Sequence, residues 1–274
     1  KRISKIEIFD KSLLNRKESK FNEFYEGLVN DKFNTDEEAA AILYNTSPLD
    51  GEYRQLKSRF SKRLLNTLFF LDSNDPSFSD YHRANYSCNK NWAQIRILLN
   101  SGARNAAIKI AAKTIGVAVI YRFSDMILNC SRILMNNASL NGDEKEYEEY
   151  AALTNKALRD VEFEIKAEEM YQRLTINFAL SAASTGELAS TADKYLDAVN
   201  KLCEQSDSYQ LHYMKYQIRI MVAQIKGQYL QTIKVCEEAE KYLNDNPNFN
   251  QKVKLANLAL IKISSYLQLR DYEN

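Results

Sequence analysis

The sequence predicts an all-α protein built as a stack of helical hairpins. It contains seven Gly and three Pro in 274 residues, well below the typical usage of about 7% and 5%. Because β-sheet folds and nucleotide-binding α/β folds need many glycine-assisted turns, this shortage favours long helices joined by short loops. The apolar residues recur with the 3.6-residue period of amphipathic helices, and no segment between turn signals alternates with period two. We therefore expect no β-sheet.

Residues 1–75 are predicted to form an N-terminal helical region that caps the array. Thr35, followed three residues later by Glu38, forms a capping box at the start of one helix. Pro48 and Pro76 bracket a longer helix whose apolar residues fall on one face. The helices expected in this region lie near 3–14, 17–31, 35–44 and 51–72. The buried face of the last one comprises Tyr53, Leu56, Phe60, Leu64, Leu68 and Leu71.

Residues 76–274 are predicted to form a helical-repeat region, because helix and short break alternate regularly after Pro76. One uninterrupted pattern, 143–183, is long enough for about 60 Å of helix at 1.5 Å per residue, so it should either protrude from the array or bridge parts of it. The helices expected here are 79–100, 103–121, 124–139, 143–183, 187–205, 208–226, 229–245 and 250–269.

The chain repeats itself between 210–231 and 253–274. At a spacing of 43 residues Tyr229 coincides with Tyr272, and isoleucines coincide within the helices that precede them. Gly102 and the small residues after it mark a further junction, because small side chains let two antiparallel helices approach closely. These features indicate hairpins that bury their faces against their neighbours, as in an α-solenoid.

This repeat resembles the tetratricopeptide repeat (TPR), whose pattern is a helix, a Gly-x-Tyr turn and a second helix with small residues at fixed positions. Gly227 and Tyr229 match the turn, Ala239 matches the later small position, and Pro247 falls near the expected repeat-ending proline. The chain departs from the family at Thr232, where Ala is usual. Its spacing also exceeds the family's 34 residues and lies in the range of HEAT-like and armadillo-like arrays. The resemblance implies a TPR-like solenoid with degenerate repeats.

The resemblance also implies a partner groove, because in such arrays the first helix of each hairpin lines the concave face. Met and Gln side chains on the 208–226 helix would form it, and a mixed Met and Gln surface suits peptide capture. The same helix also fits a plain core stripe. Trp92 is a candidate anchor on an earlier helix, although a lone Trp is more often a core residue. The candidate groove residues are Trp92, Met214, Gln217, Met221 and Gln224.

The sequence lacks the residue patterns of common catalytic and metal sites. Its two histidines, His82 and His212, belong to no H-E-x-x-H or Glu-x-x-His motif, so zinc-protease and di-iron sites are not expected. The absence of G-x-S-x-G, Walker and G-x-G-x-x-G motifs argues against nucleophile-elbow hydrolysis and phosphate binding. We therefore expect neither an enzyme nor a metal or cofactor.

Cysteine usage and hydropathy favour a cytoplasmic protein without membrane contact. The four cysteines lie far apart, with no C-x-x-C pair, in a chain large enough to need no disulfides. The first residues carry no apolar segment typical of a signal peptide. The most apolar stretch, 106–121, is too short to cross a bilayer, which needs about 20 apolar residues.

The charge balance excludes a global attraction to nucleic acid, since Lys+Arg 37 against Asp+Glu 36 leaves a formal charge of +1. The 51–72 helix nevertheless carries basic residues opposite its apolar side. With 35–44 as a first helix it has a conceivable helix-turn-helix geometry, although the connecting loop is long and acidic residues offset basic ones in this region. The other interpretation is that the basic side of the 51–72 helix only faces solvent. The basic residues are Arg54, Arg59, Lys62 and Arg63.

The long 143–183 segment is rich in acidic residues, with ten acidic and five basic residues between 143 and 173. Pairs such as Glu162 with Lys166 are typical of a solvated helix face. An acidic docking surface is the alternative.

These observations predict a non-catalytic helical-repeat scaffold that binds another protein or a peptide segment. The alternative is a transcription-regulator-like protein whose 35–72 helices contact nucleic acid. Because 253–269 aligns with the first helix of a hairpin, we also expect the protein to continue past Asn274 with an amphipathic helix. That helix would cover Leu258, Ile261 and Leu269.

Overall fold

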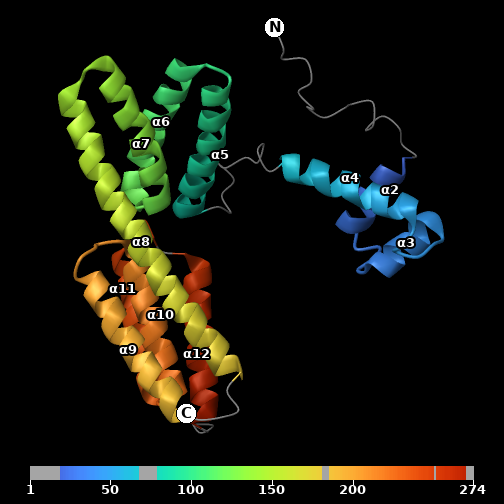
Figure 1. Cartoon of the computed structure of the whole chain (residues 1–274). Helices are drawn as coiled ribbons and strands as arrows, with labels where there is room; N and C mark the ends of the chain where they lie inside the picture. Colours follow the sequence, from blue (N-terminus) through green and yellow to red (C-terminus); the bar gives the residue numbers. More distant parts are fainter. Residues whose placement is uncertain (1–18, 68–78, 181–184, 250, 270–274) are drawn as a thin grey trace. The chain divides into compact units, whose positions relative to one another are not determined.

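The structure is a computed structural model. It describes residues 19–67, 79–180, 185–249 and 251–269. Every regular element in these ranges is an α-helix, which confirms the predicted all-α class (Figure 1). The chain divides into two compact units, unit 1 (Lys1–Asp72) and unit 2 (Ser73–Asn274).

Unit 1 has a small aromatic core enclosed by its helices. The described helices are α2 (Lys20–Val29), α3 (Asp36–Tyr44) and α4 (Gly51–Thr67). Phe24 of α2 packs edge-on against Phe60 of α4, with ring centroids 4.9 Å apart. Gly27 lies so close to the Phe33 ring that a Cβ there would come within 2.2 Å of it. The buried residues of this core are Phe24, Phe33, Ala39, Ala40, Leu43, Tyr53 and Leu56.

The capping box predicted at the start of α3 is present with a shift of one residue. Thr35 Oγ1 accepts a hydrogen bond from the Glu38 backbone N–H at 3.2 Å. Glu38 Oε2 accepts in return from the backbone N–H of Asn34 at 2.7 Å, one residue before the cap. Both bonds tie the entering chain to the first turn of α3.

The buried face predicted for α4 ends at Phe60. Tyr53 and Leu56 are buried, whereas Leu64 is 54% exposed. The reason is length, because α2 and α3 have 10 and 9 residues and α4 has 17. The buried residues of α4 accordingly lie in its first half. Outside the described residues lie Leu68, Leu71 and the helix predicted near 3–14.

Unit 2 is a succession of helices in which sequence neighbours pack together. Their ends lie within three residues of the predicted ones. The helices are α5 (Asp80–Asn100), α6 (Arg104–Tyr121), α7 (Ser124–Asn141), α8 (Glu144–Leu180), α9 (Thr185–Cys203), α10 (Tyr209–Ile225), α11 (Tyr229–Asp245) and α12 (Lys252–Gln268).

The long helix α8 bridges two of the cores of unit 2 (Figure 1). Tyr150 and Leu153, near its start, pack against the core formed by α5, α6 and α7. Ala167 and Leu174, in its second half, are buried in the core shared with α9 and α10. Of the two predicted roles for this helix, bridging is therefore the one that the structure shows.

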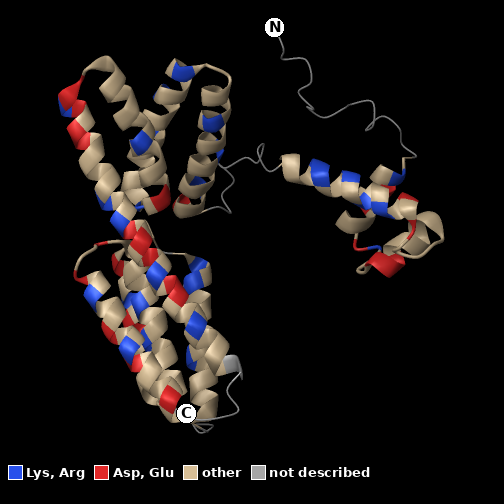
Figure 2. Cartoon of the chain, viewed as in Figure 1, with Lys and Arg blue, Asp and Glu red and all other residues tan. Residues whose placement is uncertain are grey.

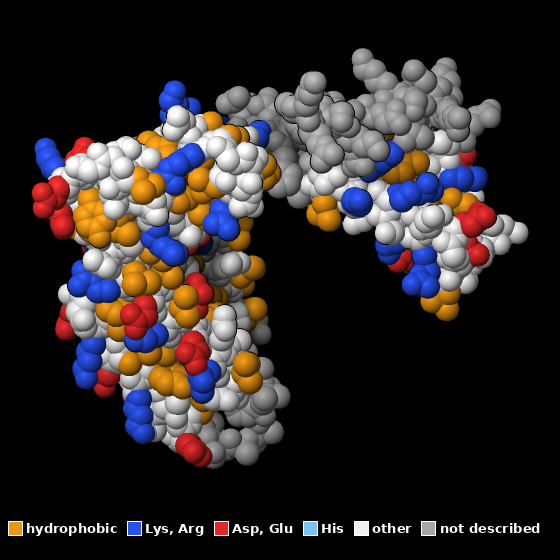
Figure 3. All heavy atoms as spheres, turned by 45° about the horizontal axis from the view of Figure 1, so that its top comes forward, with side chains coloured by type: hydrophobic (Ala, Val, Ile, Leu, Met, Phe, Trp, Pro, Cys, Tyr) orange, Lys and Arg blue, Asp and Glu red, His pale blue; other side chains and the backbone are white. Residues whose placement is uncertain are grey.

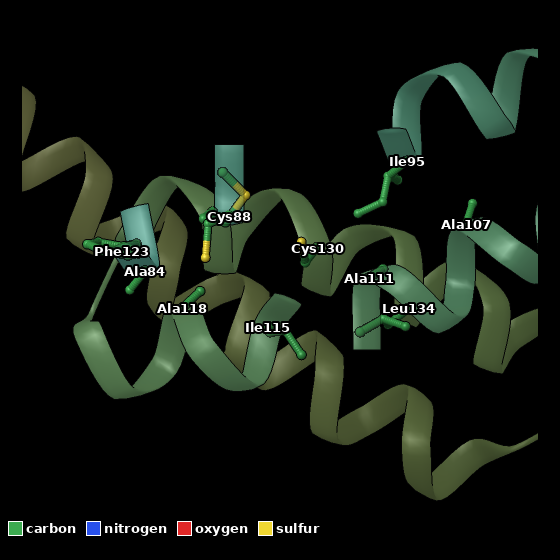
Figure 4. Close-up of a cluster of buried hydrophobic side chains, with 11 residues drawn as sticks. Ala84, Cys88, Ile95, Ala107, Ala111, Ile115, Ala118, Phe123, Cys130 and Leu134 are labelled. Carbon is green, nitrogen blue, oxygen red and sulfur yellow. The ribbon is translucent and has the colours of Figure 1, made fainter. Parts of the chain in front are cut away.

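Small residues allow the close packing of α5, α6 and α7. Ala107, Ala111 and Ala118 of α6 are fully buried. In the cluster drawn in Figure 4, Ala107 lies on the side of Ile95 of α5, Ala111 near Leu134 of α7, and Ala118 near Cys88 of α5. Side chains this small let the helix backbones approach closely at high packing density. Of the small residues that follow Gly102, Ala107 is buried at this contact, whereas Ala103 and Ala106 are exposed.

Candidate interaction surfaces

The predicted groove residues do not line one open surface. Met214 and Met221 are buried in the core that α10 shares with α8 and α9, while Gln217 and Gln224 are half-buried. Trp92 is half-buried in the separate core around α5 and α6. The structure thus places the two methionines inside unit 2 rather than along a groove.

The position of α10 explains this outcome. It packs against α8, α9 and α11, so its apolar residues are covered on several sides. Tyr213 and Ile220 belong to the core with α11 and α12, while Leu211 and Ile218 belong to the core with α8 and α9. Apolar residues on more than one side of a helix indicate that several sides are buried, so the sequence of α10 favours the plain core stripe.

The predicted basic face of α4 is exposed. Arg54, Arg59, Lys62 and Arg63 all lie on the surface of unit 1, and Figure 2 shows Lys and Arg recurring along α4. The guanidinium of Arg63 lies 5.0 Å from the centroid of the Phe21 ring, which anchors it by a cation–π contact. The other three side chains have no ion-pair partner among the described residues.

A fifth base on α4, Lys57, is neutralised locally. It forms an ion pair with Asp36 at the start of α3, and the Tyr53 hydroxyl donates to the same carboxylate at 2.8 Å. The hydrogen bonds from Lys57 and Tyr53 lower the pKa of Asp36. The carboxylate also lies at a helix N-terminus, where negative charge is favoured. Lys57 therefore joins α3 to α4 and contributes less than its neighbours to the basic face.

A polar joint forms where the middle of α8 meets the starts of α7 and α10. Glu164 Oε1 accepts hydrogen bonds from Ser124 Oγ of α7, at 2.7 Å, and from Ser208 Oγ, the N-cap of α10. Ser206 Oγ donates to Asp160 Oδ1 at 2.5 Å. Two helix N-termini and three hydroxyls thus converge on two carboxylates of α8, an arrangement that stabilises negative charge.

Electrostatics at this joint follow from burial. Burial raises the pKa of Glu164, while the hydrogen bonds from Ser208 and Ser124 partly oppose the shift. Asp207 is held differently, because Lys156 Nζ lies 2.7 Å from its Oδ1 and Arg122 is also within ion-pair distance. The hydrogen bond from Lys156 lowers the pKa of Asp207. The joint therefore holds three charged, part-exposed groups, Asp207, Lys156 and Arg122, and one buried carboxyl group, that of Glu164.

Two hollows adjoin the joint, with volumes of about 460 and 270 Å³. Cys203 and His212 both line the larger one. Burial raises the pKa of the thiol and lowers the pKa of the imidazole, and both groups hydrogen-bond to backbone carbonyls, His212 Nε2 to Ser206 at 2.9 Å and Cys203 Sγ to Leu211 at 4.0 Å. Both side chains therefore bond to the backbone near the start of α10.

Sequence reasoning missed this joint because Asp160 and Glu164 lie within the acidic run of α8. The interpretation of that run as a solvated face holds for Glu162, which pairs with Lys166 at 2.5 Å. Asp160 and Glu164 instead turn inward on the same helix. The available signal was the Ser206-x-Ser208 pair just before a predicted helix, which is typical of N-cap side chains.

The last helix, α12, exposes an apolar stripe. It packs against α11 through Leu258, which is buried, and through the half-buried Ile261. Its opposite side carries large apolar side chains, of which Val253 is 61%, Leu260 64%, Ile263 56% and Leu267 55% exposed. We call Val253, Ala256, Leu260, Ile263 and Leu267 the α12 stripe. Figure 3 shows one face of unit 2, on which apolar side chains lie among charges of both signs.

Two further kinds of site are absent from the described residues. Within the described ranges, no group of three or more His, Cys, Asp or Glu side chains is placed to hold a metal ion. None of the helices that the structure describes is long and apolar enough to cross a membrane. Comparison of the chain with protein-family models, curated proteins and solved structures finds no match.

Proposed function

We propose that the protein is a non-catalytic helical scaffold that binds another protein or a peptide segment through unit 2. The observation that carries this proposal is the α12 stripe. Exposed apolar side chains scattered singly are normal on protein surfaces, but a continuous apolar face is typical of an interaction site. Here the face is continuous along one helix, because all five residues lie on the side of α12 that is turned away from Leu258.

The energetic gain from covering the stripe is substantial. Fully burying one large aliphatic side chain contributes about 1.5–3 kcal/mol. Val253, Leu260, Ile263 and Leu267 are each more than half exposed, so covering all four is worth on the order of 5 kcal/mol. That value offsets part of the free-energy cost of bringing two proteins together, so covering the stripe favours association.

The repeat pattern supports a TPR-like, solenoid-like arrangement for this scaffold. Gly227 adopts a φ of +65° at the turn between α10 and α11, as a Gly-x-Tyr junction requires. The four free cysteines, three of them buried, support a reducing compartment, and we propose the cytoplasm. Binding a protein partner through an apolar face needs no cofactor.

Affinity purification with matched variants tests the scaffold function. We expect tagged wild-type protein, isolated from its source cells, to co-purify with defined proteins that are lost in the Leu260→Glu variant. Ile97→Glu is the control, because Ile97 is 67% exposed on α5, outside the α12 stripe. The same set of proteins with all three forms would contradict the proposal.

A second candidate function is nucleic-acid contact by the 35–72 helices, as in a transcription regulator. The favouring observation is that Arg54, Arg59 and Lys62 are exposed and free of carboxylate partners among the described residues. Phosphate contacts by such side chains make binding steeply salt-dependent. Fluorescence anisotropy with duplex DNA at two salt concentrations tests it. If DNA binding survives the Arg59→Glu and Lys62→Glu changes, the basic face of α4 is not the DNA-binding surface. Lys20→Glu on α2 is the control and should leave binding unchanged.

A further inference from the structure

The spacing of the α12 stripe specifies the kind of surface that covers it. Val253, Leu260 and Leu267 recur at intervals of seven residues, and Ala256 and Ile263 each follow three residues after one of them. This is the a and d pattern of a heptad repeat, with a mean period of 3.5 residues. Surfaces with that period pack by inserting knobs into holes of another helix. The stripe therefore fits a helix that carries apolar residues with the same period.

The positions that flank the stripe carry almost no charge. Asn257, Ala259, Ser264 and Tyr266 occupy the e and g positions, and Lys252 at the start of α12 is the one charged residue there. Charged e and g residues normally select the partner and orientation of paired helices. Their absence means that the partner helix must complement the stripe by apolar shape, and that repulsion between identical helices is small.

We propose that the α12 stripe pairs with the α12 stripe of a second copy of this chain, in antiparallel orientation. This inference rests on the proposed function of the stripe as an interaction surface. Antiparallel helices bring a positions opposite d positions, so Leu260 faces Ile263 of the second copy, and the small Ala256 faces the large Leu267. Four of the five stripe residues are thus paired about a two-fold axis, as in a symmetric dimer, and Val253 falls opposite position 270, outside the described residues.

Charge also favours the antiparallel orientation. In a parallel pair the two Lys252 side chains would meet at the same end of the interface. In the antiparallel pair they lie at opposite ends, more than one Debye length apart at physiological salt for a helix about 25 Å long. The formal charge of +1 for the whole chain adds no long-range repulsion between copies.

The size of the stripe determines the strength expected. A 17-residue helix presents a strip about 25 Å long and about 10 Å wide, which is less than the roughly 800 Å² that each partner buries in a standard interface. The dimer should therefore be weak and reversible, and it should form only at high protein concentration.

Sedimentation velocity of the full chain tests the pairing. Wild-type protein should convert from monomer to dimer as its concentration rises. Leu260→Glu should raise the dissociation constant by at least about 100-fold, as expected for loss of a central apolar contact, while Ile97→Glu should leave it unchanged. Circular dichroism melting of each variant verifies that it is folded. A wild-type chain that stays monomeric at every concentration would overturn the inference.

Cross-rescue tests the register and the orientation. Leu260→Glu and Ile263→Lys should each be monomeric alone, and their mixture should form a heterodimer, because the antiparallel register places Glu at 260 against Lys at 263. No heterodimer in the mixture would rule out this pairing. If the wild-type chain is monomeric but a photoreactive group at position 263 captures a different protein, the second-copy inference fails and the scaffold function stands. If the wild-type chain is monomeric and the photoreactive group at position 263 captures no protein, both the second-copy inference and the scaffold function fail.

Discussion

Lys254 is a lysine in a core position of α12. Its Nζ is buried without a hydrogen-bond acceptor among the described residues, and it lies 3.1 Å from the Phe249 ring centroid and 4.6 Å from that of Tyr213. In the 43-residue repeat the corresponding residue is Leu211, which is fully buried. The two rings offset part of the cost of burying the ammonium group. Burial nonetheless lowers the pKa of Lys254 to about 7.

We predict that Lys254→Met stabilises unit 2. At pH 7 and below, the folded protein must bury a charge that the unfolded chain leaves in water, so removing it should raise the free energy of unfolding by about 1–3 kcal/mol. In the wild type the unfolded chain binds one more proton between pH 7 and about 10.5, so its stability should rise with pH across that window. Urea unfolding measures both effects. Lys252→Met, at an exposed neighbour, should change neither, and a less stable Lys254→Met variant would contradict this account.

Glu164 gives a pH dependence of opposite sign. Burial raises its pKa in the folded protein, so the folded state binds this proton more tightly than the unfolded chain. The contribution to stability is full below the ordinary glutamate pKa of about 4.3 and is lost as the pH rises through the folded-state value. Glu164→Gln should remove this fall, as measured by unfolding over a pH series. Glu162→Gln, on the exposed side of α8, should retain it, and identical pH profiles for the two variants would argue against the buried joint.

The structural role of a residue was predictable from the sequence where local side-chain chemistry alone decides it. Thr35 was recognised as a cap because side-chain chemistry at a helix start is local. The roles of Met214 and Met221 were not predictable, because the same Met and Gln pattern fits a groove or a core. Only the helices packed around α10 show that these two residues belong to a core. Lys254 was also missed, since an isolated lysine in an amphipathic helix normally lies on its polar side.

Glycines in the left-handed conformation end several helices of unit 2. Gly142 terminates α7 in the left-handed conformation, with a φ of +69°. A comparison with a glycine inside a helix tests whether this conformation requires glycine. Gly116 lies within α6, and a Cβ on either glycine would meet no atom within 4 Å. The two sites therefore differ in backbone conformation and not in available space.

We predict opposite effects of alanine at these two glycines. Gly142→Ala should destabilise the protein by about 1 kcal/mol, because a side chain is strained at positive φ. Gly116→Ala should stabilise it by about 0.5–1 kcal/mol through higher helix propensity. Thermal melting of the two variants beside the wild type checks the signs. Shifts in the same direction would show that α7 does not end at Gly142 as described.

At the scale of elements, sequence periodicity predicted the helices of unit 2 to within three residues at their ends. Helix ends are set by residues such as Gly102, Gly142 and Gly227, whose signals are local. The packing of these helices was less predictable, because the bond that joins α8 to the start of α10 links Glu164 to Ser208, 44 positions later in the sequence. No local pattern encodes such a pairing.

At the scale of the molecule, the two units have separate cores. We predict that residues 73–274, produced alone, retain the helical circular dichroism and the melting midpoint that unit 2 shows in the full chain. A cooperative domain with its own core should not need unit 1 for stability. A large drop in the melting midpoint of the fragment would show that the units depend on each other.

The central claim is that the α12 stripe contacts another protein surface. Site-specific photo-cross-linking in living cells tests this most directly, with p-benzoylphenylalanine in place of Ile263, and in place of Ile97 as the control. The account predicts discrete protein adducts from position 263, whether to a second copy or to another protein, and none of these adducts from position 97. An absence of adducts from position 263, or the same adducts from both positions, would contradict it.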